Sequence, residues 1–100
     1  MINRTEILNF LRSNKDYFKV KFNIIKIGLF GSYARDEQTD TSDIDIIVLF
    51  DDNTEDLFDK RFALREYIKS KFNKKVDVCH EQAIKPVFRE LIFNETEYAY

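Results

Sequence analysis

The sequence predicts a small α/β (α+β) domain in which helices flank a mixed β-sheet, and three observations support this fold class. Apolar, β-branched runs of strand length lie at residues 24–30, 43–50 and 76–79, and the stretches around them have helical spacing. Glycine (2) and proline (1) are scarce, which argues against an all-β sandwich with many tight turns. The hydrophobic content of 44%, with 15% aromatic residues, is sufficient for a packed interior.

The length and composition limit what the chain can be. We expect residues 1–100 to form a single domain, since chains below roughly 50 residues seldom build a core. No apolar run approaches the roughly 20 residues of a membrane span, and the N-terminus lacks a signal-peptide pattern, so no membrane partner is expected. The single cysteine, Cys79, has no partner for an internal disulfide, which fits a reducing, cytoplasmic location.

Helical and extended segments alternate along the chain. In order, we expect a helix after Asn3, a short helix within 14–23, a strand at 24–30, a short helix at 32–38, a strand at 43–50, a helix at 54–73, a strand at 76–79 and a helix from Pro86. Asn3 followed by Glu6 resembles a capped helix start, Ser32 is a candidate cap, and Pro86 suits a first helical turn. Residues 97–100 are either frayed or a short edge strand.

The first two strands are apolar enough to be buried on both faces. Residues 24–30 form a continuous β-branched run that ends at Gly31. In residues 43–50, a period of two places Asp43 and Asp45 on one face, and both faces are apolar beyond Asp45. We therefore expect the 43–50 strand to lie in the centre of the sheet.

The longest helix is expected from Thr54 to about Asn73, because an apolar stripe recurs there at helical spacing. The stripe consists of Leu57, Phe58, Phe62, Leu64, Ile68 and Phe72. In the strand that follows, Asp77 and Cys79 share one face. The resulting order of helices and strands is typical of a small mixed sheet flanked by helices.

Charge is unevenly distributed, although the formal net charge is only −2. Residues 36–59 contain ten acidic side chains and no Lys or Arg, whereas residues 60–89 contain nine basic side chains and three acidic ones. This segregation produces separate electrostatic fields of opposite sign on one small domain. Most of these charges, however, are expected simply to be solvent-exposed surface residues. The small net charge gives no overall case for a nucleic-acid partner.

Asp43 and Asp45 are a candidate metal site. Acids two residues apart on a strand project from one face, with Cβ atoms roughly 6–7 Å apart. Such a pair repels itself unless a cation lies between the two carboxylates. The pair is therefore either solvated at an exposed strand end or a hard-cation site, and oxygen-only ligands favour Mg²⁺ over Zn²⁺.

Gly31 and Ser32 are a candidate phosphate site. They fall where a buried strand turns into a helix, so that backbone amides and the Ser32 hydroxyl are available to a phosphate. An ordinary strand-to-helix cap is the alternative. Phosphates bound at Gly31 and Ser32, together with a metal at Asp43 and Asp45, would fit a metal-bound nucleoside triphosphate.

Asp77 is the third candidate element. A carboxylate between two valines in mid-strand is costly if it is buried without a partner. If this strand lies beside the one that carries Asp43 and Asp45, the three carboxylates can converge and hold two metal ions. A solvent-facing residue on an edge strand is the alternative.

These residues resemble a known signature. Gly31-Ser32, ten residues, Asp43-Ile44-Asp45 and a later Asp77 are similar to the pattern of the DNA polymerase β-like nucleotidyltransferase superfamily. The segments 31–35 and 42–46 look like those of the minimal nucleotidyltransferases, which are commonly antitoxins of HEPN-domain ribonucleases. The resemblance covers residues 24–78 and implies a polymerase β-like nucleotidyltransferase core.

The resemblance also implies roles. Gly31 and Ser32 would hold the triphosphate of ATP, Asp43 and Asp45 would bind Mg²⁺, and Asp77 would bind metal and help to activate the acceptor hydroxyl. Two Mg²⁺ ions are implied. The reaction would transfer AMP to a tyrosine hydroxyl of a HEPN toxin, which would be silenced in a hetero-oligomer. Many relatives have glycine after the Ala-Arg pair, where this chain has Asp36.

Other functions stay open at this point. The chain could be a binding subunit that masks its toxin without catalysis, because ten Phe and five Tyr are many for one small core and some of them could form an interface. It could also be a nucleotidyltransferase that acts on a small molecule or an RNA end. Arg35 could reach the triphosphate or pair with nearby surface acids, and the surface pair is favoured.

Overall fold

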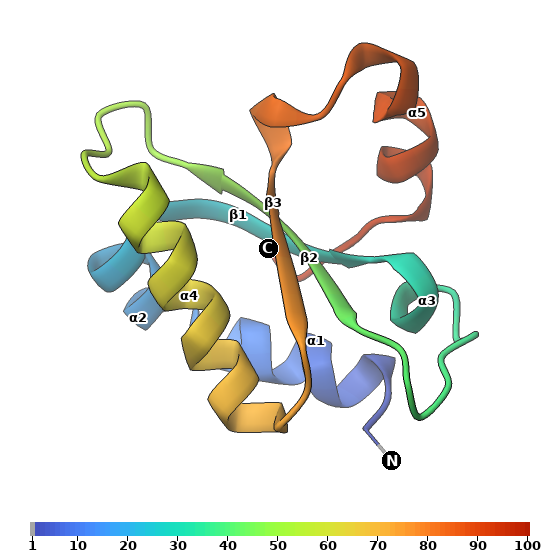
Figure 1. Cartoon of the computed structure of the whole chain (residues 1–100). Helices are drawn as coiled ribbons and strands as arrows, with labels where there is room; N and C mark the ends of the chain where they lie inside the picture. The colour runs from blue at the N-terminus through green and yellow to red at the C-terminus, as the bar shows by residue number, and fades with distance from the viewer. Residues whose placement is uncertain (1) are drawn as a thin grey trace.

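The computed structural model describes residues 2–100, and its elements follow the predicted order (Figure 1). The helices are α1 (Arg4–Ser13), α2 (Lys15–Phe22), α3 (Gly31–Ala34), α4 (Leu57–Phe72) and α5 (Pro86–Glu95), with a short 3₁₀ turn at Glu81–Ala83. The strands are β1 (Ile24–Phe30), β2 (Ile44–Phe50), β3 (Val76–His80) and β4 (Glu97–Tyr98). No helix in the described part of the chain is long and apolar enough to cross a membrane.

The four strands form one mixed sheet in the order β3-β2-β1-β4. β1 pairs antiparallel with both β2 and β4, while β2 and β3 run parallel. β2 therefore lies inside the sheet, as its apolar faces predict. The C-terminal residues form an edge strand, which decides between the two alternatives for that segment.

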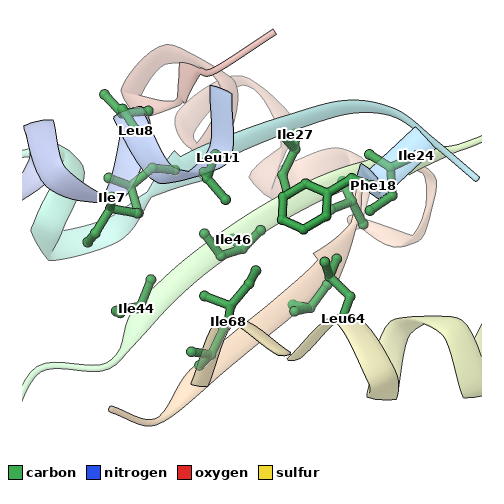
Figure 2. Packing of buried hydrophobic residues seen from close by; sticks show 14 of the residues in the cluster. Ile7, Leu8, Leu11, Phe18, Ile24, Ile27, Ile44, Ile46, Leu64 and Ile68 are labelled. Carbon is green, nitrogen blue, oxygen red and sulfur yellow. The ribbon is translucent and has the colours of Figure 1, made fainter. Parts of the chain in front are cut away.

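The main core lies on one face of the sheet. Figure 2 shows Ile44 and Ile46 of β2 pointing toward Leu64 and Ile68 of α4, with α1 contributing to the same cluster. Figure 1 shows α1, α2 and α4 gathered on this side and α5 on the other. Because side chains alternate along a strand, Asp45 must point to the face that carries α5.

Two predicted helix starts are confirmed. The Asn3 side chain accepts a hydrogen bond from the backbone N–H of Glu6 at 2.9 Å and so caps α1. Pro86 occupies the first turn of α5, where a missing N–H costs nothing.

Two other predicted helix boundaries are wrong. The helix expected at 32–38 is only α3, and Phe30 rather than Ser32 lies at its cap position. It ends early because Asp36 adopts a left-handed conformation with φ of 57°. The helix expected from Thr54 begins at Leu57, because the Thr54 hydroxyl instead donates a hydrogen bond to the carbonyl of Asp51 at 2.6 Å.

The apolar stripe of α4 is buried only in part. Leu64 and Ile68 are buried, but Leu57, Phe58 and Phe62 are 38%, 72% and 49% exposed. These three residues line or flank hollows beside β3 instead of entering the core. The expected stripe is thus split between core and surface, because helical spacing alone does not show which row of side chains faces the sheet.

We expect Ile46→Ala to lower the free energy of unfolding by about 2–5 kcal/mol, because it leaves a cavity under a fully buried side chain. Urea unfolding measures this change. Val20→Ala is the matched control, since Val20 is 83% exposed and its truncation is expected to cost less than about 0.5 kcal/mol. Similar losses for the two variants would contradict the placement of β2 in the core.

Candidate functional site

The parallel pairing of β2 and β3 brings two of the predicted acids together. Asp45 is the register partner of Asp77, so their Cα atoms lie side by side and their side chains share one face. Asp45 is partly buried and Asp77 is exposed at the edge of the sheet. The expectation that the Asp77 strand lies beside the strand of Asp45 is confirmed.

Asp43 precedes β2 and turns partly toward another partner. Its Oδ2 lies 3.8 Å from the Nζ of Lys75, the residue before β3. Among residues 2–100, no three acidic, histidine or cysteine side chains are placed so that together they hold a metal ion. Carboxylates without a cation between them repel one another, so a bound cation would favour bringing these acids together.

The environment of Asp45 disfavours its charged form. Burial is the largest cause that raises the pKa of Asp45 to about 6, and the charges of Asp77, Asp43 and Glu95 raise it further. Arg35 acts in the opposite direction. A divalent cation would relieve this excess of negative charge, and the oxygen-only donors fit a hard ion such as Mg²⁺.

Gly31 links the predicted phosphate site to the acids. It has a φ of 75°, which side chains rarely adopt, and it is buried. A Cβ atom at this position would overlap Oδ2 of Asp45 and lie 3.0 Å from its Cγ. Only glycine therefore allows the end of β1 to approach the Asp45 carboxylate this closely. Ser32 follows directly in α3, which at four residues is too short for a useful helix dipole.

Glu95, at the end of α5, is a residue of this site that the sequence did not reveal. Its Oε1 accepts the backbone N–H of Gly31 at 3.2 Å, and its Oε2 accepts Nη1 of Arg35 at 2.8 Å. An amide and a guanidinium are the donors that a phosphate group would use. A carboxylate of this chain thus occupies part of the predicted phosphate site.

The structure shows which partner Arg35 takes and how the turn at Asp36 is formed. Arg35 pairs with Glu37 at 3.2 Å, as the surface alternative predicts, and the hydrogen bonds that its guanidinium donates to Glu95 and then to Glu37 raise its pKa. The left-handed Asp36 has the backbone conformation that glycine adopts most readily. The turn that glycine would favour is therefore present, and Arg4 pairs with Asp36 at 3.6 Å.

The chain is similar in sequence and in fold to several known proteins. Residues 13–100 match the family described as "Polymerase beta, Nucleotidyltransferase". "Putative protein adenylyltransferase MJ1379" of Methanocaldococcus jannaschii is 44% identical over 80 residues, which is 80% of either chain. "Protein adenylyltransferase MntA" of Thermococcus cleftensis is 31% identical over 98 residues, covering 98% of this chain and 97% of that protein. A crystal structure of a toxin-antitoxin with AMP-PNP matches with a TM-score of 0.69 and 26% identity, covering 99% of this chain and 73% of that one.

Asp45→Asn is expected to stabilise the protein at neutral pH but not at acidic pH. The folded carboxyl stays protonated up to about pH 6, whereas the unfolded one ionises near pH 4. The stability contributed by Asp45 is thus complete below about pH 4 and is lost as the pH rises through about 6. Urea unfolding at pH 8 should favour the variant by on the order of 1 kcal/mol, after discounting for solvent screening.

Asp52→Asn is the control for this comparison, because Asp52 is exposed on a loop. It should change the free energy of unfolding little at any pH. A stability difference between Asp45→Asn and the wild type that stays constant from pH 4 to pH 8 would be evidence against a carboxyl titrating in a crowded acidic site.

Proposed function

The chain belongs to the polymerase β nucleotidyltransferase family, and we propose that it transfers AMP from ATP to a hydroxyl of a partner protein. The observation that carries the proposal is the placement of Asp45 opposite Asp77, directly beside Gly31. The two relatives described above are named protein adenylyltransferases, which supports a protein acceptor.

The transfer is an in-line substitution at the α-phosphorus of ATP. The acceptor oxygen forms a bond to this phosphorus, the bond to the bridging oxygen of the β-phosphate breaks, and pyrophosphate leaves. The acceptor proton moves to Asp77, which lies exposed at the edge of the sheet where an acceptor can approach. Positioning and charge neutralisation supply most of the acceleration in such reactions.

The triphosphate is held where β1 ends. The backbone N–H of Gly31 and the Ser32 hydroxyl bind its oxygens. Glu95 must release Gly31 before the nucleotide takes the same amide, because a carboxylate and a phosphate cannot share that donor. The same movement frees Arg35 to pair with phosphate oxygens.

Asp43, Asp45 and Asp77 are not placed in the structure to hold an ion jointly, so they would have to move toward one another to bind Mg²⁺, for which the family resemblance implies two ions. When bound, the metal neutralises phosphate charge and lowers the pKa of the attacking hydroxyl. The raised pKa of Asp45 supports this assignment, because a carboxyl destabilised by its acidic neighbours gains most from a cation.

The proposed partner is a HEPN-domain ribonuclease toxin, and the acceptor is one of its tyrosine hydroxyls. The toxin-antitoxin structure with AMP-PNP that this chain resembles supports both a toxin partner and ATP as the nucleotide. Transfer of AMP would neutralise the toxin, with this chain as the antitoxin in a hetero-oligomer.

A second candidate is an antitoxin that neutralises its toxin by covering it. The exposed face of α5 favours this reading, since Val87 and Leu91 are 79% and 67% exposed. Large apolar side chains gathered on a single helix are typical of a protein interface. Neutralisation by Asp43→Asn/Asp45→Asn at a one-to-one ratio with toxin would favour masking over catalysis.

Asp45→Asn and Asp77→Asn are each expected to reduce AMP transfer at least about 100-fold, because one loses a metal ligand and the other the group that takes the proton. The assay incubates the protein with α-labelled ATP, Mg²⁺ and the HEPN toxin, and follows label on the toxin. Asp52→Asn, which removes an exposed acid outside the site, should transfer AMP at the wild-type rate. Equal rates of AMP transfer by all three variants would contradict the proposed site.

Glu95→Gln is expected to tighten nucleotide binding. Removal of one negative charge next to the phosphates is worth about 1 kcal/mol, or roughly a fivefold lower Kd for AMP-PNP. Calorimetric titration measures the Kd, with Glu97→Gln as the control because Glu97 is exposed on β4. Weaker binding by Glu95→Gln would mean that Glu95 supports the loop at Gly31 and does not compete with the nucleotide.

A further inference from the structure

Two open hollows adjoin each other along the outer edge of β3. The first has a volume of about 260 Å³ and is lined by Phe58, Arg61, Phe62, Arg65, Asp77 and Val78. The second, of about 310 Å³, shares Arg65 and Asp77 with the first and continues to Lys69 and Lys75. Together they form a groove between α4 and β3 that passes Asp77, and we call it the β3 groove.

The β3 groove is positively charged. Arg61, Arg65 and Lys69 follow one another at intervals of four residues, so they form one row on α4. Among the residues that line the two hollows, Glu66 and Asp77 oppose this charge, and Lys75 is paired with Asp43 at 3.8 Å. The closest partner of Arg65 is Glu66 at 3.8 Å, a distance that leaves the guanidinium available to a better acceptor.

The strand at the groove offers an unpaired backbone edge. β3 is the last strand of the sheet on its side, with no further strand beside it among residues 2–100. The carbonyl of Lys75 accepts the N–H of Ile44 at 3.0 Å and so points to β2. Because backbone groups alternate along a strand, those of Val76 and Val78 point outward into the groove.

We propose that the acceptor protein enters the β3 groove as an extended acidic segment that adds to the sheet beside β3. The proposal rests on AMP transfer as the proposed function, because Asp77 is the group that takes the acceptor proton. The outward backbone groups of β3 would pair with the segment, and the row on α4 would bind its acidic side chains.

The alternation of side chains sets the pattern of this segment. A residue of the segment paired opposite Asp77 projects to the same face as Asp77 and Asp45, where the α-phosphate is attacked. Its two neighbours project to the other face, toward Arg61, Arg65 and Phe62. The acceptor hydroxyl is therefore flanked on both sides by acidic or apolar residues.

A peptide suits the β3 groove better than RNA does. The backbone edge at Val76 and Val78 has no counterpart to pair with in a nucleic acid. RNA binding is therefore an outcome that the test must be able to detect.

The test measures binding of a fluorescent peptide with a central tyrosine flanked by glutamates, using wild-type protein and AMP-PNP with Mg²⁺. We expect Arg61→Glu/Arg65→Glu to weaken binding at least about tenfold, and replacement of the peptide's glutamates by lysines to do the same to the wild type. Lys19→Glu/Lys21→Glu on α2, with the same change in net charge, should bind the peptide normally. N-methylation of alternate peptide bonds should also abolish binding, because it blocks addition to a strand.

Three results would overturn the proposal. The first is equal binding of the glutamate and lysine peptides to the wild type. The second is equal binding of the glutamate peptide by the two charge-reversed variants. The third is displacement of the glutamate peptide by single-stranded RNA that binds the protein more tightly than the peptide does. A measurement of AMP-PNP binding without peptide distinguishes failure of the groove proposal from failure of the proposed function. If AMP-PNP binds and Asp45→Asn abolishes AMP transfer, but peptide binding does not depend on the groove residues, only the groove proposal is wrong.

Discussion

The parallel register between β2 and β3 is the constraint on which the rest of the site depends. It sets Asp45 opposite Asp77 and directs both carboxylates to the face away from the main core. A slip of one residue would turn Asp77 toward the core and Val76 or Val78 toward Asp45, at a high cost in buried charge. The valines of β3 thus determine where the acid points, because their burial under α4 holds the register.

The same register gathers negative charge that the fold does not neutralise. Asp45 is crowded by Asp77, Asp43 and Glu95, and among residues 2–100 Arg35 acts against their effect. The Gly31 amide donates its hydrogen bond to Glu95, which adds a further carboxylate to the site. Stability given up in this way is typical of functional sites, where a ligand supplies the missing charge. The protein is therefore expected to be most stable when metal and nucleotide are both bound.

Local patterns in the sequence predicted most of this arrangement. The period of two in residues 43–50 placed both acids on one face, and the Asn3 cap and Pro86 marked helix starts that the structure confirms. The role of Glu95 could not be predicted, because its contact with Gly31 joins residues 64 positions apart. Helical spacing could not show that Phe58 and Phe62 face a groove either, since that depends on how α4 is rotated against β3.

The proposed cation site requires Asp43, Asp45 and Asp77 to come together around an ion, and the titration of Asp45 reports whether they do. Carbon-13 NMR of the carboxyl groups should give Asp45 an apparent pKa of about 6 without metal. Addition of Mg²⁺ and AMP-PNP should lower this value by more than about one pH unit, because a cation favours the ionised form. A pKa near 4 that neither addition changes would contradict the account.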